Sequence, residues 1–196
     1  MTSFRISSPF SGAAPASVEL ATWPRGALAS HDDPDLRISL DRFAGPVGYP
    51  LRPGFERYLL PLAGTDVELT DADDRRLARP RPGEVTRISG EQATRVAPRA
   101  GKETASLVVA TVRRGAARPS LQLFPLGRRE LREPLGPLAA ILVLGGSLRV
   151  RATNEEEALD LEDRECLCIE DGRAGDELAL AGLDEGTRVV LVQLDA

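Results

Sequence analysis

Arg57 is the residue whose type and surroundings point most directly to chemistry. It lies in the segment Phe55–Leu62, where most of the other side chains are large and apolar. A guanidinium stays protonated and only donates hydrogen bonds, so in such a segment it needs a negative partner. Glu56 is adjacent, but the alternation of a strand turns it to the opposite face. Arg57 is therefore interpreted as an anion binder; the alternative is an ion pair with Glu56 or another carboxylate at the rim of the fold.

The spacing around Arg57 resembles the metal-binding frame of cupins, which are small β-barrels. In that frame a Gly, a His-x-His pair, a Glu and a second Gly recur at fixed distances. Gly45 and Gly64 stand here at the two glycine positions, Leu51 and Pro53 at the histidine positions and Arg57 at the glutamate position. Leu and Pro side chains offer no lone pair to a metal, and a guanidinium only donates. We therefore expect no bound metal and no cofactor.

Histidine is scarce elsewhere too. Counting on from Gly83 places Thr94 where a cupin has its fourth ligand, a histidine. His31 is the only histidine, and its Asp-rich surroundings indicate an exposed loop. A single histidine cannot form a multi-histidine metal site, and no local motif pairs it with a serine nucleophile.

Four further residues are candidates for the same cavity. Arg37 and Ser39 share one face of the expected strand Leu36–Leu40, and this face is either solvated or lines the cavity. Trp23, the only Trp, either packs in the core or forms a wall on which a ligand stacks. Tyr58 supplies a hydroxyl group beside the proposed anion binder. The candidate ligand-binding set is Arg57, Arg37, Ser39, Trp23 and Tyr58.

The elements that must position these residues are short strands. The chain has 18 Gly and 15 Pro among 196 residues, and apolar residues alternate with polar ones over many short stretches. The segment Tyr58–Leu69 and the segment Leu138–Val150 share one form: an apolar strand, a Gly-containing turn and an alternating strand. We therefore predict an all-β fold of two cupin-like halves (double-stranded β-helices, or jelly rolls) packed as a bicupin. The expected halves are residues 1–115 and 116–196.

Charge and composition exclude several partners. Residues 1–115 hold 16 Lys and Arg against 14 Asp and Glu, whereas residues 116–196 hold 9 against 16. No basic run or nucleic-acid module is present, so no nucleic-acid partner is expected. No apolar run approaches the roughly 18 residues of a membrane span. Cys166 and Cys168 are two residues apart in an apolar strand, where a disulfide between them would be strained. Cysteines that do not form a disulfide are typical of a cytoplasmic protein.

Several segments together resemble the HutD/Ves family. They are Trp23, Leu36–Ser39, Pro53–Leu59, Leu62–Gly64 and Arg113–Gly115. The resemblance implies a metal-free two-cupin fold, no established catalytic activity and a role in binding a small metabolite of histidine utilisation. The chain departs from the family pattern: the Asn and glycine triplet after Trp23 are absent, Leu36 replaces a Trp and Glu56 replaces an Asp. If that Asn and those glycines hold the family's ligand, this chain binds something else or nothing.

Three function classes follow. The first is a metal-free binding protein for a small carboxylate metabolite. The second is a metal-independent enzyme of the isomerase or epimerase type, or a hydrolase, acting on an anionic small molecule; Glu56 and Glu84 are the only carboxylates expected near the cavity. The third is a structural, dimer-forming domain without a cavity. The scarcity of acid–base candidates favours the first class, and a homodimer is left open.

Overall fold

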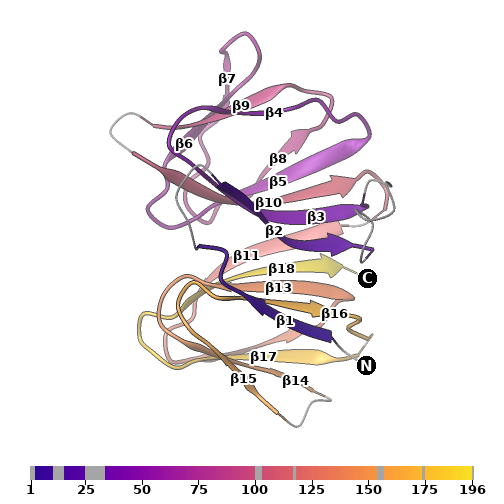
Figure 1. Cartoon of the computed structure of the whole chain (residues 1–196), viewed down its shortest axis with the longest axis vertical. Helices are drawn as coiled ribbons and strands as arrows, with labels where there is room; N and C mark the ends of the chain where they lie inside the picture. Colours follow the sequence, from indigo (N-terminus) through magenta and orange to yellow (C-terminus); the bar gives the residue numbers. More distant parts are fainter. Residues whose placement is uncertain are drawn as a thin grey trace. The chain divides into compact units, whose positions relative to one another are not determined.

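Strands make up all the regular structure of the described chain. The computed structural model describes residues 3–10, 16–24, 34–99, 103–116, 118–153, 157–173 and 175–195. No helix occurs in these ranges (Figure 1), so the predicted all-β fold is confirmed. Within them, accordingly, there is no helix long and apolar enough to cross a membrane. His31 lies outside the described residues.

Residues 12–117 form one compact unit. It contains a five-stranded sheet in the order β2-β3-β10-β5-β8 and a four-stranded sheet in the order β4-β9-β6-β7. The strands are β2 (Ala16–Trp23), β3 (Leu36–Phe43), β4 (Val47–Tyr49), β5 (Phe55–Pro61), β6 (Val67–Thr70), β7 (Arg76–Ala78), β8 (Thr86–Ser89), β9 (Thr94–Pro98) and β10 (Ala105–Arg113).

Residues 118–196 form the second unit together with residues 1–11. Its two sheets have the orders β1-β16-β13-β18-β11 and β12-β17-β14-β15. The strands are β1 (Ser3–Ser7), β11 (Arg118–Pro125), β12 (Glu130–Pro134), β13 (Leu138–Val143), β14 (Leu148–Ala152), β15 (Leu159–Leu161), β16 (Cys166–Glu170), β17 (Glu177–Gly182) and β18 (Arg188–Asp195).

The two units repeat one topology. The order β3-β10-β5-β8 corresponds strand for strand to β11-β18-β13-β16, and β4-β9-β6-β7 corresponds to β12-β17-β14-β15. The extra strand differs, because β2 pairs with β3 whereas β1 pairs with β16. The expected division assigned residues 1–11 to the first half, but the pairing of β1 groups them with the second unit.

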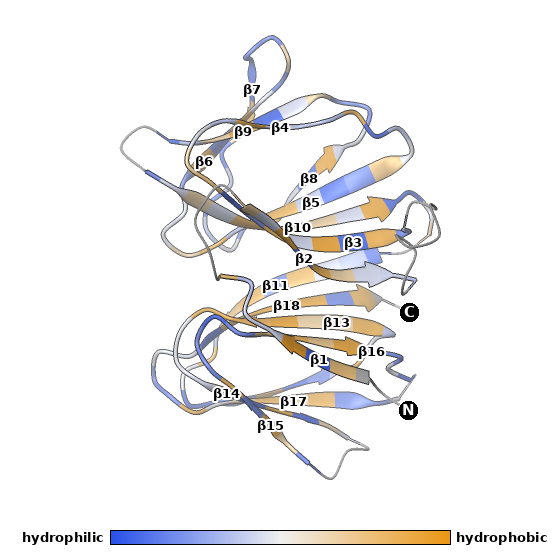
Figure 2. Cartoon of the chain, viewed as in Figure 1, coloured by the Kyte–Doolittle hydropathy of each residue, from blue (hydrophilic) through white to orange (hydrophobic). Residues whose placement is uncertain are grey.

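Alternation along the strands builds the core of each unit. In the 12–117 unit, apolar residues of the five-stranded sheet pack against Val67, Leu69 and Val96 of the four-stranded sheet. In the other unit, β13 is coloured hydrophobic along most of its length (Figure 2), and all six of its residues are buried. Cys166 and Cys168 are buried free thiols in β16. Burial is the main reason that their pKa values are raised, to about 12 and about 11.

Candidate functional site

Strand register places three of the five candidate residues on one face of the large sheet. Arg37 of β3 and Arg57 of β5 are both opposite Thr111 of β10, so the three form one row across neighbouring strands. Ser39 lies in the next row, opposite Val109. Val109 belongs to the core cluster that reaches both sheets. Directly opposite residues point to the same side, so this face is the one turned toward the interior of the unit.

Arg57 carries a buried charge on this interior face. The residue is 3% exposed. Its Nη2 donates to the Pro50 carbonyl at 2.6 Å, and its guanidinium lies 5.6 Å from the centre of the Tyr49 ring. Its Nη1 is buried and has no hydrogen-bond partner among the described residues. Desolvation first, and repulsion from Arg52 second, lower the pKa of Arg57. The site therefore holds a cation that no described carboxylate neutralises.

Beside Arg57 lies a hydrogen-bonded group that the sequence did not single out. The Tyr49 hydroxyl donates to Asp41 Oδ2 at 2.8 Å, and the Ser17 hydroxyl donates to Asp41 Oδ1 at 2.6 Å. Burial first, and the Asp41 carboxylate second, raise the pKa of Tyr49 well above its usual value. The available signal was the alternation of β3, since Asp41 follows Ser39 by two residues and shares its face. Tyr49 gave no comparable signal, because it ends a strand of only three residues.

Arg37 is less enclosed than Arg57. Its Nε lies 3.2 Å from Glu19 Oε2, and 41% of its side chain is exposed. The same Nε lacks the geometry of a hydrogen bond, so the contact with Glu19 is an ion pair without alignment. Ser39 is buried at 7% exposure. Arg37 thus lies toward solvent, and Ser39 lies deeper in the unit.

A pocket of about 300 Å³ opens next to this group. Its lining includes Tyr49 and Pro50, both of which contact Arg57, and also Thr94. Thr94, at the fourth ligand position of the cupin frame, is 3% exposed, and its hydroxyl donates to the Gln92 carbonyl at 3.2 Å. The pocket therefore shares two walls with the surroundings of Arg57.

The other positions of the cupin frame do not converge on that pocket. Leu51 is 58% exposed, and Pro53 is also exposed. In the described part of the chain, no three His, Cys, Asp or Glu side chains are grouped so that they could hold a metal ion. The polar groups in or next to the pocket are hydroxyl groups, guanidinium groups and two carboxylates, Asp41 and Asp71. Asp71 already accepts hydrogen bonds from the amides of Asp73 and Arg75. The guanidinium groups are the feature that suits an organic anion.

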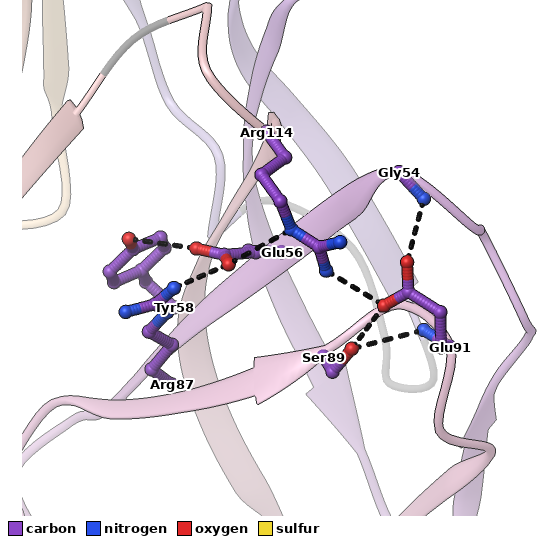
Figure 3. A network of polar contacts seen from close by, with 7 residues as sticks. All are labelled: Gly54, Glu56, Tyr58, Arg87, Ser89, Glu91 and Arg114. Atoms are coloured by element: carbon purple, nitrogen blue, oxygen red, sulfur yellow. Dashed lines mark hydrogen bonds and ion pairs between the residues drawn. The ribbon is translucent and has the colours of Figure 1, made fainter.

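Tyr58 and Trp23 lie on the other face of the sheet. The Tyr58 hydroxyl lies 3.3 Å from Glu56 Oε2 and donates to it (Figure 3). Trp23 of β2 pairs with Leu36 of β3. Leu36 and its neighbour Arg37 point to opposite faces, and Arg37 points inward, so Trp23 lies on the outward face. The structure therefore brings together Arg57, Arg37 and Ser39, and it separates Tyr58 and Trp23 from them.

Glu56 is the centre of a polar network on that other face (Figure 3). Arg87 donates to its Oε1, and Arg114 Nε donates to the same oxygen at 3.3 Å. These contacts, with the hydrogen bond from Arg87 the largest contribution, lower the pKa of Glu56. Glu56 thus pairs with Arg87 and Arg114 and does not supply a carboxylate partner to Arg57, as the alternation of β5 predicts.

Glu91 extends this network to the turn before β5. It accepts from the Gly54 amide at 3.0 Å, from Arg114 Nη2 at 2.8 Å and from the Ser89 hydroxyl. Arg114 N also donates to the Gly54 carbonyl at 2.7 Å. The Pro-Gly-x-Glu-Arg and Arg-Arg-Gly segments, which carry the family resemblance, are therefore joined here by mutually satisfied groups.

Comparisons with known proteins agree with this architecture. A conserved protein of unknown function from Pseudomonas aeruginosa PAO1 shares 19% identity and a TM-score of 0.75, over 99% of this chain and 100% of that one. HutD from Pseudomonas fluorescens SBW25 shares 13% identity and a TM-score of 0.67, over 99% and 100%. Protein Ylba from E. coli shares 10% identity and a TM-score of 0.66, over 98% and 90%. At these identities the likeness concerns the fold alone.

Sequence comparison identifies the family. No curated protein matches the sequence. The HutD family model matches residues 13–189, which is most of the chain and covers strands of both units. The chain belongs to the HutD family.

Proposed function

We propose that this chain is a metal-free, cupin-type binding protein that takes a small carboxylate metabolite at Arg57. The observation that carries the proposal is the buried Nη1 of Arg57, which has no hydrogen-bond partner among the described residues. A buried, unpaired charge is costly, and a carboxylate of a ligand would both neutralise it and accept its free N–H groups. Membership of the HutD family supports a ligand from amino-acid catabolism, with histidine breakdown as the first place to look.

The neighbouring groups set what else the ligand offers. Asp41 and Ser39 lie on the same inward face as Arg57, and Tyr49 contacts its guanidinium. Asp41 accepts hydrogen bonds, so it favours a ligand that carries an N–H or O–H group in addition to its carboxylate. Such chemistry is found in amino acids and their N-acyl derivatives.

A second candidate function is a metal-independent enzyme acting on an anionic small molecule, of the isomerase or epimerase type. The observation in its favour is the 2.8 Å hydrogen bond between Tyr49 and Asp41, next to Arg57. A carboxylate and a phenol in contact form an acid–base pair that could move a proton on a bound substrate. Turnover of a bound ligand, followed by NMR, would distinguish this enzyme from a binding protein.

The direct test of binding is a thermal-shift screen of the full chain against dicarboxylates, amino acids and N-acyl amino acids, followed by calorimetry on the compounds that stabilise it. Arg57→Lys keeps the charge but loses the fork of parallel N–H groups, and we expect it to weaken binding by about 1–3 kcal/mol. Arg57→Ala should abolish measurable binding.

Arg75→Ala is the matched control, because Arg75 is exposed on the turn before β7. It should bind like the unmodified protein. A screen in which no compound stabilises the protein would remove the support for an anion site at Arg57. Binding that survives both Arg57 variants would have the same consequence.

A further inference from the structure

A second pocket lies in the unit of residues 118–195, between the turn that joins β11 to β12 and the turn that joins β17 to β18. It has a volume of about 620 Å³ and is formed by residues 125–129 and 185–188. Three of its lining residues are Arg128, Arg129 and Arg188, and one is Glu185. Nothing in the proposed carboxylate site involves these residues.

Backbone contacts lock the two turns of this pocket together. The amides of Leu126 and Gly127 both donate to the Thr187 carbonyl at 2.9 Å, and the Gly182 amide donates to the Arg129 carbonyl at 2.9 Å. The turns are so close that a Cβ atom on Gly182 would lie 1.8 Å from the Gly127 oxygen. The backbone of the pocket is therefore preformed, and a ligand need order only the exposed side chains of the lining.

Two of the arginines are held by carbonyl groups instead of carboxylates. Arg129 donates from Nε to the Leu126 carbonyl at 3.1 Å and from Nη2 to the Pro125 carbonyl at 2.8 Å. Arg188 donates from Nη2 to the Leu144 carbonyl at 3.3 Å. A carbonyl orients a guanidinium but does not neutralise it. Each guanidinium has five N–H groups, so donors remain on both side chains.

The charge of the pocket is positive within an acidic part of the chain. Arg128 Nε lies 3.7 Å from Glu185 Oε1, but these side chains are 68% and 86% exposed, so the pair holds only weakly. Three arginines against one glutamate leave a formal charge of +2. Residues 116–196 hold 9 Lys and Arg against 16 Asp and Glu, so a third of their basic residues line this one pocket.

We propose that this pocket binds a small metabolite through a phosphate-ester group. A phosphate monoester places a charge of about −1.5 to −2 on one group at pH 7, which matches the pocket, and its oxygens suit guanidinium forks. A Cβ atom on Gly186 would meet nothing within 4 Å, so the backbone there leaves room for that group. The volume exceeds that of phosphate alone and accommodates an organic remainder.

Titration calorimetry of the full chain at low ionic strength tests this, with phenyl phosphate, inorganic phosphate and succinate as probes. We expect one saturable site for phenyl phosphate, with weaker binding of succinate. The double variant Arg129→Gln/Arg188→Gln should lower the affinity at least tenfold. Glu185→Gln should raise it several-fold, because it removes the one negative charge of the lining.

Two controls make the outcome specific. Arg151→Gln alters an exposed arginine of β14 outside the pocket and should change nothing. Arg57→Ala should leave phosphate binding intact, so failure of the carboxylate site and failure of this pocket are distinguishable. If the double variant melts early, Arg128→Gln replaces it, since Arg128 is an exposed residue and its ion pair with Glu185 is exposed as well. Absence of saturable binding, tighter binding of succinate or an equal loss in Arg151→Gln would overturn the proposal.

Discussion

Arg57 and Glu56 are neighbours in sequence with opposite electrostatic surroundings. Glu56 faces two arginines and a tyrosine hydroxyl, whereas Arg57 has only a carbonyl and an aromatic ring among the described residues. The alternation of β5 separates the two side chains, so the carboxylate nearest in sequence cannot serve the guanidinium. The stability of the unliganded chain and the proposed binding role therefore place opposite demands on Arg57.

The first prediction follows from that conflict. Without ligand, Arg57→Met should be more stable than the unmodified protein by about 1–3 kcal/mol, because an apolar side chain of similar length replaces an uncompensated buried charge. Pro50, whose carbonyl loses its donor, is an exposed residue. Urea unfolding measured by circular dichroism would show the gain. A clear loss of stability would instead assign Arg57 a structural role.

The second prediction concerns Glu56. Its pKa is lowered in the folded chain chiefly by the hydrogen bond from Arg87, so its contribution to stability is complete above its unfolded pKa of about 4.3 and is lost as the pH falls through the folded pKa. Glu56→Gln should therefore cost about 1–3 kcal/mol at pH 7. The cost should shrink below about pH 4.

Unfolding curves measured from pH 3 to pH 7 test that shape. Glu103→Gln is the control, because it makes the same substitution at an exposed residue outside the network of Glu56. A penalty for Glu56→Gln that stays constant over this range would show that lost packing, and not the ion pairs, explains the effect.

At the scale of elements, the turn at residues 89–91 fixes where β5 begins. Gly90 donates to the Phe55 carbonyl at 2.8 Å, and its own carbonyl accepts from the Arg52 amide at 2.7 Å. A Cβ atom at Gly90 would lie 2.1 Å from the Arg52 oxygen. This backbone contact sets the register from which Arg57 points inward.

The third prediction is that Gly90→Ala lowers stability by at least about 3 kcal/mol, because the clash is with backbone that cannot rotate away. Gly45→Ala is the matched control, since a Cβ atom there would meet nothing within 4 Å, and it should change stability by less than about 0.5 kcal/mol. Chemical denaturation of both variants decides the matter. Equal effects of the two variants would mean that the close backbone contact between residues 52 and 90 does not limit which residue can stand at position 90.

Many of the strands, and the faces on which their residues lie, were predictable from the sequence, because they depend on local patterns. Alternation over residues 36–40 gave a strand and put Arg37 and Ser39 on one face, as β3 shows. The same alternation puts Tyr58 and Arg57 on different faces of β5, and it therefore argues against Tyr58 as a candidate for the cavity. The repeat of strand, turn and strand predicted two similar halves, and the strand orders of the two units agree with it.

What the sequence could not predict depends on residues far apart in the chain. Arg37 and Arg57 share a row only because β10 pairs with both β3 and β5. Asp41 receives its hydrogen bonds from Ser17 and Tyr49, which lie in different strands and different sheets. Register across sheets follows from the whole set of turns, and no local period encodes it.

At the scale of the whole molecule, one topology is used twice with different additions. The shared eight strands of each unit give two facing sheets, and each unit then extends its large sheet at a different position, with β2 beside β3 or β1 beside β16. An added edge strand pairs backbone groups that would otherwise be open to another chain. The two units therefore differ in which edge of the large sheet is covered by an added strand.

The fourth prediction is that removing residues 1–8 destabilises the second unit and promotes association. Phe4 packs against the core cluster of that unit, and its loss should cost about 1–3 kcal/mol. The exposed edge of β16 should also pair with other copies. Thermal melts and size-exclusion chromatography report the two effects separately. Phe4→Ala should reproduce the loss of stability without the association, and an unchanged monomer in both would contradict the prediction.

The pairing of β1 with β16 also fixes an order of events during synthesis. Ser3 is opposite Glu170, and Ser7 is opposite Cys166, so about 160 residues separate the partners. At roughly 5–20 residues per second, ribosomes need about 8–30 s to make that length. Every pairing of β2 to β10 lies within residues 16–113 and can form in that interval. β1 thus leaves the ribosome long before its partner β16 and is among the last of these strands to join its sheet.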